Sequence, residues 1–144
     1  RVTEKRWMDL AANMRSGIRH CPKCGAEVFY DTAKAEKGHC CWNCKAPVPM
    51  AGVLQIGRRR RLLIQPDARL YRHQISGDYD MHTVVGTVVR NPKNPALLGL
   101  RNDSQENWTY LKTDGTQLPI APGRSAAIVR GAGIDFGSKK GEFK

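Results

Sequence analysis

The sequence of 144 residues contains no apolar run approaching the length that crosses a membrane, and no secretory signal pattern. It also lacks the local motifs of common catalytic sites: the nucleophile elbow, the phosphate-binding P-loop, the dinucleotide fingerprint and the H-E-x-x-H metal site. No carboxylate spacing indicates an acid–base pair, and His73 and His82 are isolated. These absences predict that the chain is not an enzyme, although a catalytic site built from scattered residues would leave no such pattern.

Acidic residues are scarce, because 13 Asp and Glu stand against 24 Lys and Arg, giving a formal net charge of +11. A basic balance suits nucleic acid, an anionic membrane surface, acidic proteins or phosphorylated ligands. The one dense run of charge is Arg58–Arg61. It could face a ligand, or it could be a solvated strand edge where charge prevents pairing with another sheet.

Cysteine is limited to five residues, and four of them have the spacing C-x2-C-x16-C-x2-C. The four are Cys21, Cys24, Cys41 and Cys44. This spacing predicts a zinc ribbon, in which an intervening hairpin brings two cysteine knuckles together. Four thiolates close the coordination shell of Zn²⁺ and leave no position for a catalytic water, so the metal is expected to be structural.

The fifth cysteine, Cys40, could replace Cys41 as a ligand, but the second knuckle would then have the less usual spacing C-x3-C. His20 and His39 flank the knuckles and could also substitute for a cysteine, although an all-cysteine site is favoured. An odd cysteine count with four residues in metal spacing indicates a reducing compartment, and hence the cytoplasm.

The segment 1–20 is predicted to be an amphipathic helix or linker, with Thr3 as a plausible N-cap. Its apolar stripe consists of Trp7, Leu10, Ala11, Met14 and Ile18. The stripe could pack on the ribbon, on the following domain or on a preceding domain. The chain opens at Arg1 without an initiator methionine, so we expect it to be an excised piece of a longer protein.

The ribbon is expected over residues 21–50, with a strand at Val28–Tyr30 and a polar turn at Lys34–Gly38. Trp42 is expected to pack over the metal site. Pro47 and Pro49 then mark a boundary.

Residues 53–140 contain short β-like runs separated by turn signals, which predicts a β-sandwich and a mainly β protein. One of these runs is Arg69–Ile75, and no segment within residues 53–140 has helical periodicity. The sharpest hairpin signal is Asp114-Gly115 between two strand-like runs. No internal repeat is evident.

The β region resembles a divergent forkhead-associated domain. The matching segments are Ile56–Arg58, Leu70–Ile75, Leu98–Ser104 and Gly131–Gly137. The resemblance implies a sandwich whose loops at one end bind phosphothreonine peptides, and Leu70 stands where that family has a phosphate-binding serine. The ligand-binding residues implied by this resemblance and by the nearby positive charge are Arg58, Arg72, Asn102, Ser104 and Asn107.

The order of helix, ribbon and sandwich is also similar to the C-terminal region of a group of bacterial eukaryotic-type serine/threonine kinases. The match is carried by Cys21–Asp31 and Cys41–Cys44, with support from Leu70–His73 and Asn91–Pro95. The resemblance implies a parent protein that phosphorylates proteins with ATP. The fragment itself has no glycine-rich loop, His-Arg-Asp or Asp-Phe-Gly motif.

Three hypotheses follow. The first is a noncatalytic regulatory or interaction module of a bacterial serine/threonine kinase, which binds phosphorylated or acidic protein partners. The second is a nucleic-acid-binding zinc ribbon, for which the basic balance is suited. The third is a structural adaptor in which zinc fixes the helix and the sandwich in one orientation. None of the three involves a membrane.

Overall fold

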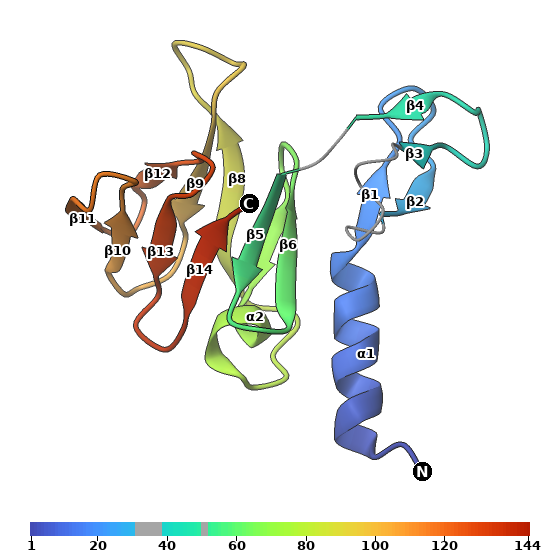
Figure 1. The fold of residues 1–144 in the computed structure, drawn as a ribbon, viewed down its shortest axis with the longest axis horizontal. Helices are drawn as coiled ribbons and strands as arrows, with labels where there is room; N and C mark the ends of the chain where they lie inside the picture. The colour runs from blue at the N-terminus through green and yellow to red at the C-terminus, as the bar shows by residue number, and fades with distance from the viewer. Residues whose placement is uncertain (31–38, 50–51) are drawn as a thin grey trace. The chain divides into compact units, whose positions relative to one another are not determined.

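The computed structural model describes residues 1–30, 39–49 and 52–144. The chain divides into two compact units, Arg1–Gly52 and Val53–Lys144, and each is described by itself (Figure 1). Most of the regular structure is antiparallel β-sheet, which confirms the predicted mainly β class. Among the described residues, no helix is both long enough and apolar enough to cross a membrane.

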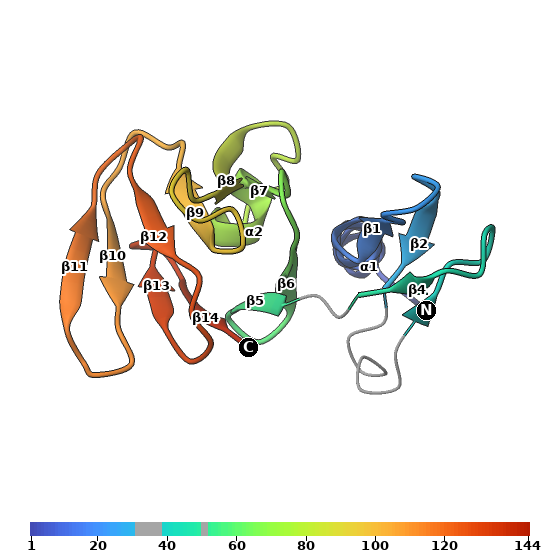
Figure 2. The same ribbon diagram turned by 90° about the horizontal axis from the view of Figure 1, so that it is seen from above.

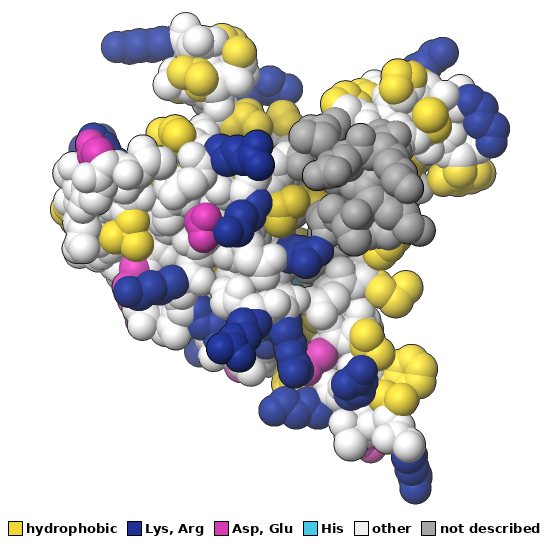
Figure 3. Space-filling view, viewed as in Figure 1, with side chains coloured by type: hydrophobic (Ala, Val, Ile, Leu, Met, Phe, Trp, Pro, Cys, Tyr) yellow, Lys and Arg dark blue, Asp and Glu magenta, His cyan; other side chains and the backbone are white. Residues whose placement is uncertain are grey.

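The N-terminal unit begins with α1 (Glu4–Ser16), which starts as the capping pattern predicts. The Thr3 side chain accepts a hydrogen bond from the backbone N–H of Arg6 (3.3 Å), which satisfies one of the donors left open at a helix start. No residue of α1 is buried, and Trp7 and Met14 are both 62 % exposed. The predicted stripe is therefore present on α1 and exposed, except that Ile18 lies in the following strand because the helix ends at Ser16. Figure 3 shows hydrophobic side chains along one side of the helix.

Two short hairpins follow α1. The first pairs β1 (Ile18–His20) with β2 (Glu27–Phe29), and the second pairs β3 (His39–Cys40) with β4 (Pro47–Val48). Each cysteine knuckle is the connection within one of these hairpins, and the segment between the knuckles, predicted to fold back as a hairpin, lies partly outside the described residues. The predicted turn at Lys34–Gly38 lies outside the described residues.

The C-terminal unit, hereafter the sandwich, consists of two antiparallel sheets. The six-stranded sheet has the order β11-β10-β13-β14-β5-β6, and the four-stranded sheet has the order β12-β9-β8-β7. Figure 2 shows β11, β10, β13 and β14 following one another in the larger sheet. Its strands are β5 (Gly52–Ile56), β6 (Arg60–Ile64), β10 (Trp108–Leu111), β11 (Gln117–Ile120), β13 (Gly133–Asp135) and β14 (Lys140–Phe143). Those of the smaller sheet are β7 (Arg69–Tyr71), β8 (Val84–Arg90), β9 (Leu98–Asn102) and β12 (Ser125–Ala127).

Both sheets contribute side chains to one hydrophobic core, as expected for two sheets packed face to face. Leu54 and Phe143 come from the larger sheet and Leu100 comes from the smaller one, and all three are fully buried. Trp108 packs edge-on against Phe136 with ring centroids 4.8 Å apart. The sandwich therefore has an apolar core of its own.

The segment predicted as one strand over Arg69–Ile75 is β7 followed by a short helix, α2 (Arg72–Ser76). The Gln74 side chain accepts a hydrogen bond from the backbone N–H of Tyr71 (2.8 Å), and Gly77 ends the helix in the left-handed conformation with φ 82°. The prediction of an uninterrupted strand is therefore wrong, because the Gln74 amide stabilises the turn into α2.

The Asp114-Gly115 signal is confirmed. Gly115 has φ 88° in the connection between β10 and β11, a conformation that favours glycine. The backbone N–H of Lys112 donates to the carbonyl of Thr116 (2.9 Å) and closes the hairpin.

Candidate functional site

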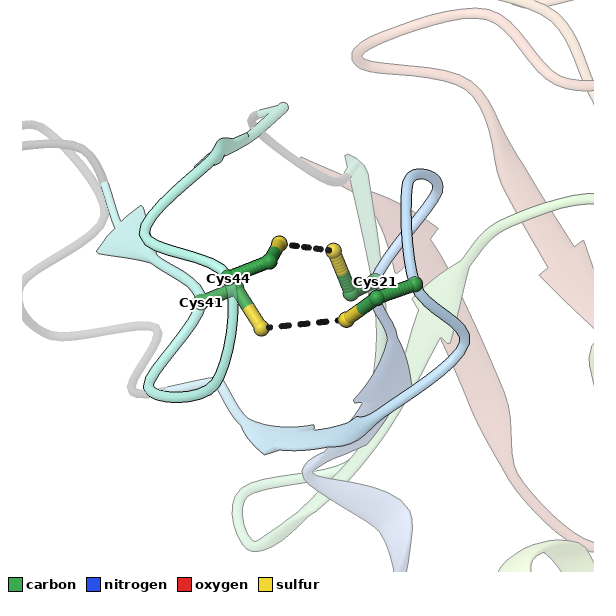
Figure 4. Close-up of side chains that lie close together, drawn as sticks. Cys21, Cys41 and Cys44 are labelled. Atoms are coloured by element: carbon green, nitrogen blue, oxygen red, sulfur yellow. Dashed lines mark hydrogen bonds between the residues drawn. The ribbon is translucent and has the colours of Figure 1, made fainter.

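The four predicted ligands form one sulfur cluster, in which all Sγ atoms lie within 4.8 Å of one another. Cys21 Sγ is 3.7 Å from Cys44 Sγ, and Cys24 Sγ is 3.6 Å from Cys41 Sγ (Figure 4). A tetrahedral zinc–thiolate centre with bonds of about 2.3 Å has sulfur–sulfur edges of about 3.8 Å. The cluster therefore has the donor set and nearly the spacing of a closed tetrahedral metal site.

Both knuckles have the same backbone hydrogen bonds across their hairpins. In the first, the N–H of Cys21 donates to the carbonyl of Ala26 (2.9 Å), and in the second the N–H of Cys41 donates to the carbonyl of Ala46 (2.9 Å). Each hairpin thus holds its two cysteines on one tight turn, and the two turns face each other across the sulfur cluster.

The two hairpins form a structural repeat that the sequence interpretation missed. The signal is the pattern C-x2-C-x-A-x-V, present in Cys21–Val28 and again in Cys41–Val48. The residue after each knuckle has a positive φ, 73° at Gly25 and 59° at Lys45. Because Lys45 takes a conformation that favours glycine, the turn geometry is set by the knuckle rather than by the residue type.

The pKa values of the thiols are shifted in different directions within the cluster. A hydrogen bond from the backbone N–H of Ala26 lowers the pKa of Cys24 to about 6, and the neighbouring thiols lower it further. The backbone N–H of Ala46 also lowers the pKa of Cys44, but burial and the thiols of Cys24 and Cys21 outweigh it and raise the value to about 11. Cys44 is thus the thiol with a raised pKa, and a bound cation would favour its deprotonation.

Trp42 does not pack over the sulfur cluster as predicted. Its side chain is 66 % exposed, and its indole N–H donates to the backbone carbonyl of Glu27 in β2 (2.8 Å). Asn43 instead approaches a ligand, because its side-chain amide lies 3.7 Å from Cys24 Sγ.

The alternative ligands lie outside the sulfur cluster. Cys40 and His20 are exposed, and His39 packs against the Tyr30 ring with centroids 4.4 Å apart. The group of metal-ligating side chains formed by the described residues contains only the four predicted cysteines. None of the five cysteines is in a disulfide.

Several connections of the sandwich meet at one end, which we call the loop end: residues 57–59, 72–83, 103–107 and 137–139. The N–H of Gly57 donates to the carbonyl of Lys140 (3.0 Å), which joins the β5–β6 turn to the start of β14. The Ser138 hydroxyl donates to the carbonyl of Ile75 (2.5 Å), which joins the β13–β14 loop to α2. Pairing of Thr109 with Asp135 places the β9–β10 loop at the same end, which is the lower end of the sandwich in Figure 1.

The arginine run is divided between two settings. Arg58 and Arg59 are exposed in the β5–β6 turn at the loop end. Arg61 lies in β6, an edge strand, where its Nε donates to the side-chain oxygen of Gln55 (2.9 Å). Only the first half of the run is therefore placed to meet a ligand at the loop end.

Arg72, the first residue of α2, forms an ion pair with Asp78 (Nε–Oδ2 3.0 Å), and both side chains are partly exposed. A hydrogen bond from the backbone N–H of Asp80 lowers the pKa of Asp78, with smaller contributions from Ser76 and Arg72. The Arg72 guanidinium is therefore at the loop end but already contacts one carboxylate of its own chain.

Asn102 supports the loop end from inside and does not face a ligand, which corrects its expected role. The side chain is fully buried, and its Nδ2 donates to the carbonyls of Glu106 (2.7 Å) and Ile120 (3.0 Å). Its Oδ1 accepts hydrogen bonds from the backbone N–H (2.9 Å) and the hydroxyl (2.7 Å) of Ser104. Ser104 is thereby also used within the loop, whereas Asn107 is exposed.

Asp80 organises the loop between α2 and β8. Its carboxylate accepts hydrogen bonds from the Thr83 hydroxyl (2.6 Å) and from the backbone N–H groups of Thr83 (2.9 Å) and His82 (3.0 Å). The Thr83 bonds are the main reason that the pKa of Asp80 falls to about 2.

Comparison of the chain with protein-family models, with curated proteins and with solved structures finds no match. What can be said of its function therefore comes from the sulfur cluster and the loop end.

Proposed function

We propose that the chain is a noncatalytic interaction module whose sandwich binds acidic or phosphorylated segments of a protein partner at the loop end. The observation that carries this proposal is the convergence of cations there. Arg58 and Arg59 are exposed in one turn, and Arg72 lies at the start of α2. The Lys139 ammonium lies beside Gly77 at the other end of α2, 3.8 Å from where a Cβ would stand. Arginine suits a phosphate or a carboxylate because its guanidinium donates two parallel hydrogen bonds.

The distribution of charge favours the sandwich, rather than the zinc ribbon, as the unit that binds an acidic partner. Residues 53–144 contain 15 Lys and Arg against 8 Asp and Glu, whereas residues 1–52 contain 9 against 5. A zinc ion with four thiolates contributes about −2 to the N-terminal unit, which leaves that unit at about +2, compared with +7 for residues 53–144. Figure 3 shows Lys and Arg side chains spread over the sandwich with few acidic ones among them.

The sulfur cluster is proposed to hold Zn²⁺ in a structural role. The four cysteines would fill the tetrahedron, and the ion would stabilise two hairpins that have little apolar core of their own. Thiols kept for a metal rather than paired in disulfides suit a reducing compartment, so we place the protein in the cytoplasm.

The sequence resemblances extend the proposal to a forkhead-associated-like sandwich in a bacterial serine/threonine kinase. A two-sheet sandwich with candidate residues at one end is the architecture that the first resemblance implies. The parent would phosphorylate proteins with ATP, and this region would regulate it or select its partners.

Binding of the metal-loaded chain to a phosphothreonine peptide library tests the proposal, with unphosphorylated peptides as controls. We expect phosphate-dependent binding that Arg58→Ala abolishes. The matched control is Lys93→Ala, because Lys93 is exposed in the β8–β9 connection at the opposite end of the sandwich. Equal binding of unphosphorylated peptides of low charge, or equal loss with Lys93→Ala, would contradict the proposal.

Nucleic-acid binding is the second candidate, and the observation that favours it is the exposed indole of Trp42, which is free to stack on a base. Binding to single-stranded DNA that weakens steeply with salt and is reduced by Trp42→Ala would support it. If neither ligand binds, the structural adaptor is the better account of the chain.

A further inference from the structure

The outer face of the six-stranded sheet contains a row of side chains defined by the strand register. Leu54, Ile134 and Phe143 point into the core, so their neighbours along each strand point outwards. Gln55, Glu142, Gly133 and Leu111 are successive partners across β5, β14, β13 and β10. The row thus crosses four strands and has no side chain at its third position.

The outer face of the sheet also contains a groove of about 490 Å³, within the range of ligand sites, and Gly133 is one of its lining residues. Gly133 does not have a positive φ, so its backbone conformation does not require glycine. A Cβ there would lie 3.1 Å from the Gly141 carbonyl oxygen, a tight contact with the backbone of β14, and 3.5 Å from Leu111 Cδ1, so a larger residue would crowd the floor of the groove. Glycine within a strand has a conformational cost and often marks a place where another chain comes close.

The groove is rimmed by more cations than anions. Lys112, Lys140 and Lys144 line it, and Glu142 is its one acidic lining residue. Glu142 is paired with Lys144 (2.9 Å), and Lys140 reaches Asp135 beside the groove (3.5 Å). Two of the three lysines are thus paired with the two carboxylates, and Lys112 leaves a surplus of one positive charge, which complements an anionic occupant.

The positions of the lysines indicate an extended occupant. Lys140 begins β14 and Lys144 directly follows its end, so the two lie four residues apart, a distance of about 13 Å along an extended chain. Leu111 offers an apolar contact between them, and no lining residue is aromatic, which disfavours the stacked bases of a single-stranded nucleic acid. We propose that this groove, which runs over the outer face of the sheet from Gly57 at the loop end, is a second binding site for an extended acidic segment of a protein partner.

The test uses the full ¹⁵N-labelled chain loaded with metal and titrated with a deca-glutamate peptide. Amide shifts are expected at Leu111, Gly133 and Gly141. Substituting both Lys112→Gln and Lys144→Gln should weaken deca-glutamate binding about fivefold, because it removes two positive charges from the groove. These two lysines are chosen because they lie at the end of the groove far from Arg58. The control is the double variant Arg69→Gln and Lys93→Gln, which removes the same charge from exposed positions around the smaller sheet.

Gly133→Val provides a second variant that blocks the floor without changing charge. Gly133→Val should abolish the amide shifts that deca-glutamate causes at Leu111. It should leave phosphopeptide binding at the loop end intact, and that binding would show that the sandwich of the variant is folded. Three results would overturn the groove site: equal weakening by the control pair, shifts confined to the loop end, or unchanged deca-glutamate binding by a folded Gly133→Val protein. Tighter binding of a ten-residue oligothymidylate at the same amides would also overturn it. Failure of the groove would leave the loop-end proposal standing, since that depends on Arg58.

Discussion

Asn102 and Asn107 lie in the same stretch between β9 and β10 but have opposite environments. Asn102 is fully buried with four hydrogen bonds, and Asn107 is exposed. Asn102→Ala should lower the free energy of unfolding of the sandwich by about 2–3 kcal/mol, because it leaves buried polar groups of the loop without partners. Urea denaturation followed through Trp108 measures this change.

Asn107→Ala is the matched control, because it removes the same groups from an exposed site and should change the unfolding free energy by less than about 0.5 kcal/mol. If the two substitutions had equal effects on stability, Asn102 would not be the support of this loop. If Asn107→Ala reduced phosphopeptide binding without affecting stability, it would join Arg58 as a ligand-binding residue.

Asp80 makes a pH-dependent contribution to the loop between α2 and β8. Its pKa is about 2 in the folded chain, chiefly through the Thr83 hydrogen bonds, against an ordinary value of 3.8. Because the folded value is the lower one, the carboxylate stabilises the fold above about pH 4, and this contribution is lost as the pH falls toward 2. Acid unfolding followed by circular dichroism should show this loss in the wild type.

Asp80→Asn keeps the shape and the acceptor oxygen of the side chain but cannot titrate. This variant should be less stable at neutral pH, and its stability should change less than that of the wild type between pH 4 and pH 2. Parallel acid profiles for the two proteins would show that another carboxylate controls this range.

At the scale of elements, the paired knuckles predict that substituting a cysteine of the sulfur cluster and substituting Cys40 outside it have different effects on metal binding. Cys24→Ser removes a member of the sulfur cluster, so bound zinc should fall from about one ion per chain toward none and the two hairpins should lose their structure. Elemental analysis of the purified protein measures the metal directly. Cys40→Ser is the matched control, because Cys40 is exposed and outside the cluster.

Full zinc content in Cys24→Ser, or its loss in Cys40→Ser, would show that the ligand set is wrong. The first result would point to a substitute ligand such as His20, and the second to the C-x3-C spacing of the second knuckle.

The elements that the sequence predicted well are those specified by a few adjacent residues. The knuckle spacing anticipated the sulfur cluster, Thr3 anticipated the start of α1, and Asp114-Gly115 anticipated the β10–β11 hairpin. In each case a local chemical requirement, such as ligand spacing, a cap or a turn, leaves a short pattern.

The elements that it missed depend on contacts between distant residues. Gln74 stabilises α2 and also donates to the carbonyl of Arg61 in β6, thirteen residues away (3.3 Å). Asn102 has a polar side chain of the kind that binds ligands, so its sequence position alone suggests a binding role. Its hydrogen bond to the carbonyl of Ile120 shows instead that it stabilises the β9–β10 loop from inside the sandwich. The groove at Gly133 likewise exists only because the register sets it between Leu111 and Glu142.

At the scale of the whole molecule, the two units have different sources of stability. Both sheets of the sandwich contribute side chains to its apolar core. The N-terminal unit buries few apolar side chains, and no residue of α1 is buried. A sulfur cluster that binds metal would supply the missing stabilisation in the N-terminal unit. The distinction matters for function, since the proposed binding residues and the groove all belong to the sandwich.

The three tryptophans allow this separation to be measured in the intact chain. Trp108 is 1 % exposed in the sandwich core, whereas Trp7 and Trp42 in the N-terminal unit are more than half exposed. In a Trp7→Phe and Trp42→Phe variant, the remaining emission therefore reports the sandwich alone. Removing the metal with a chelator should leave the midpoint of thermal unfolding seen by Trp108 unchanged, because the core around it does not depend on the sulfur cluster. A fall of several degrees on chelation would show instead that the metal stabilises both units, which is what the structural adaptor requires.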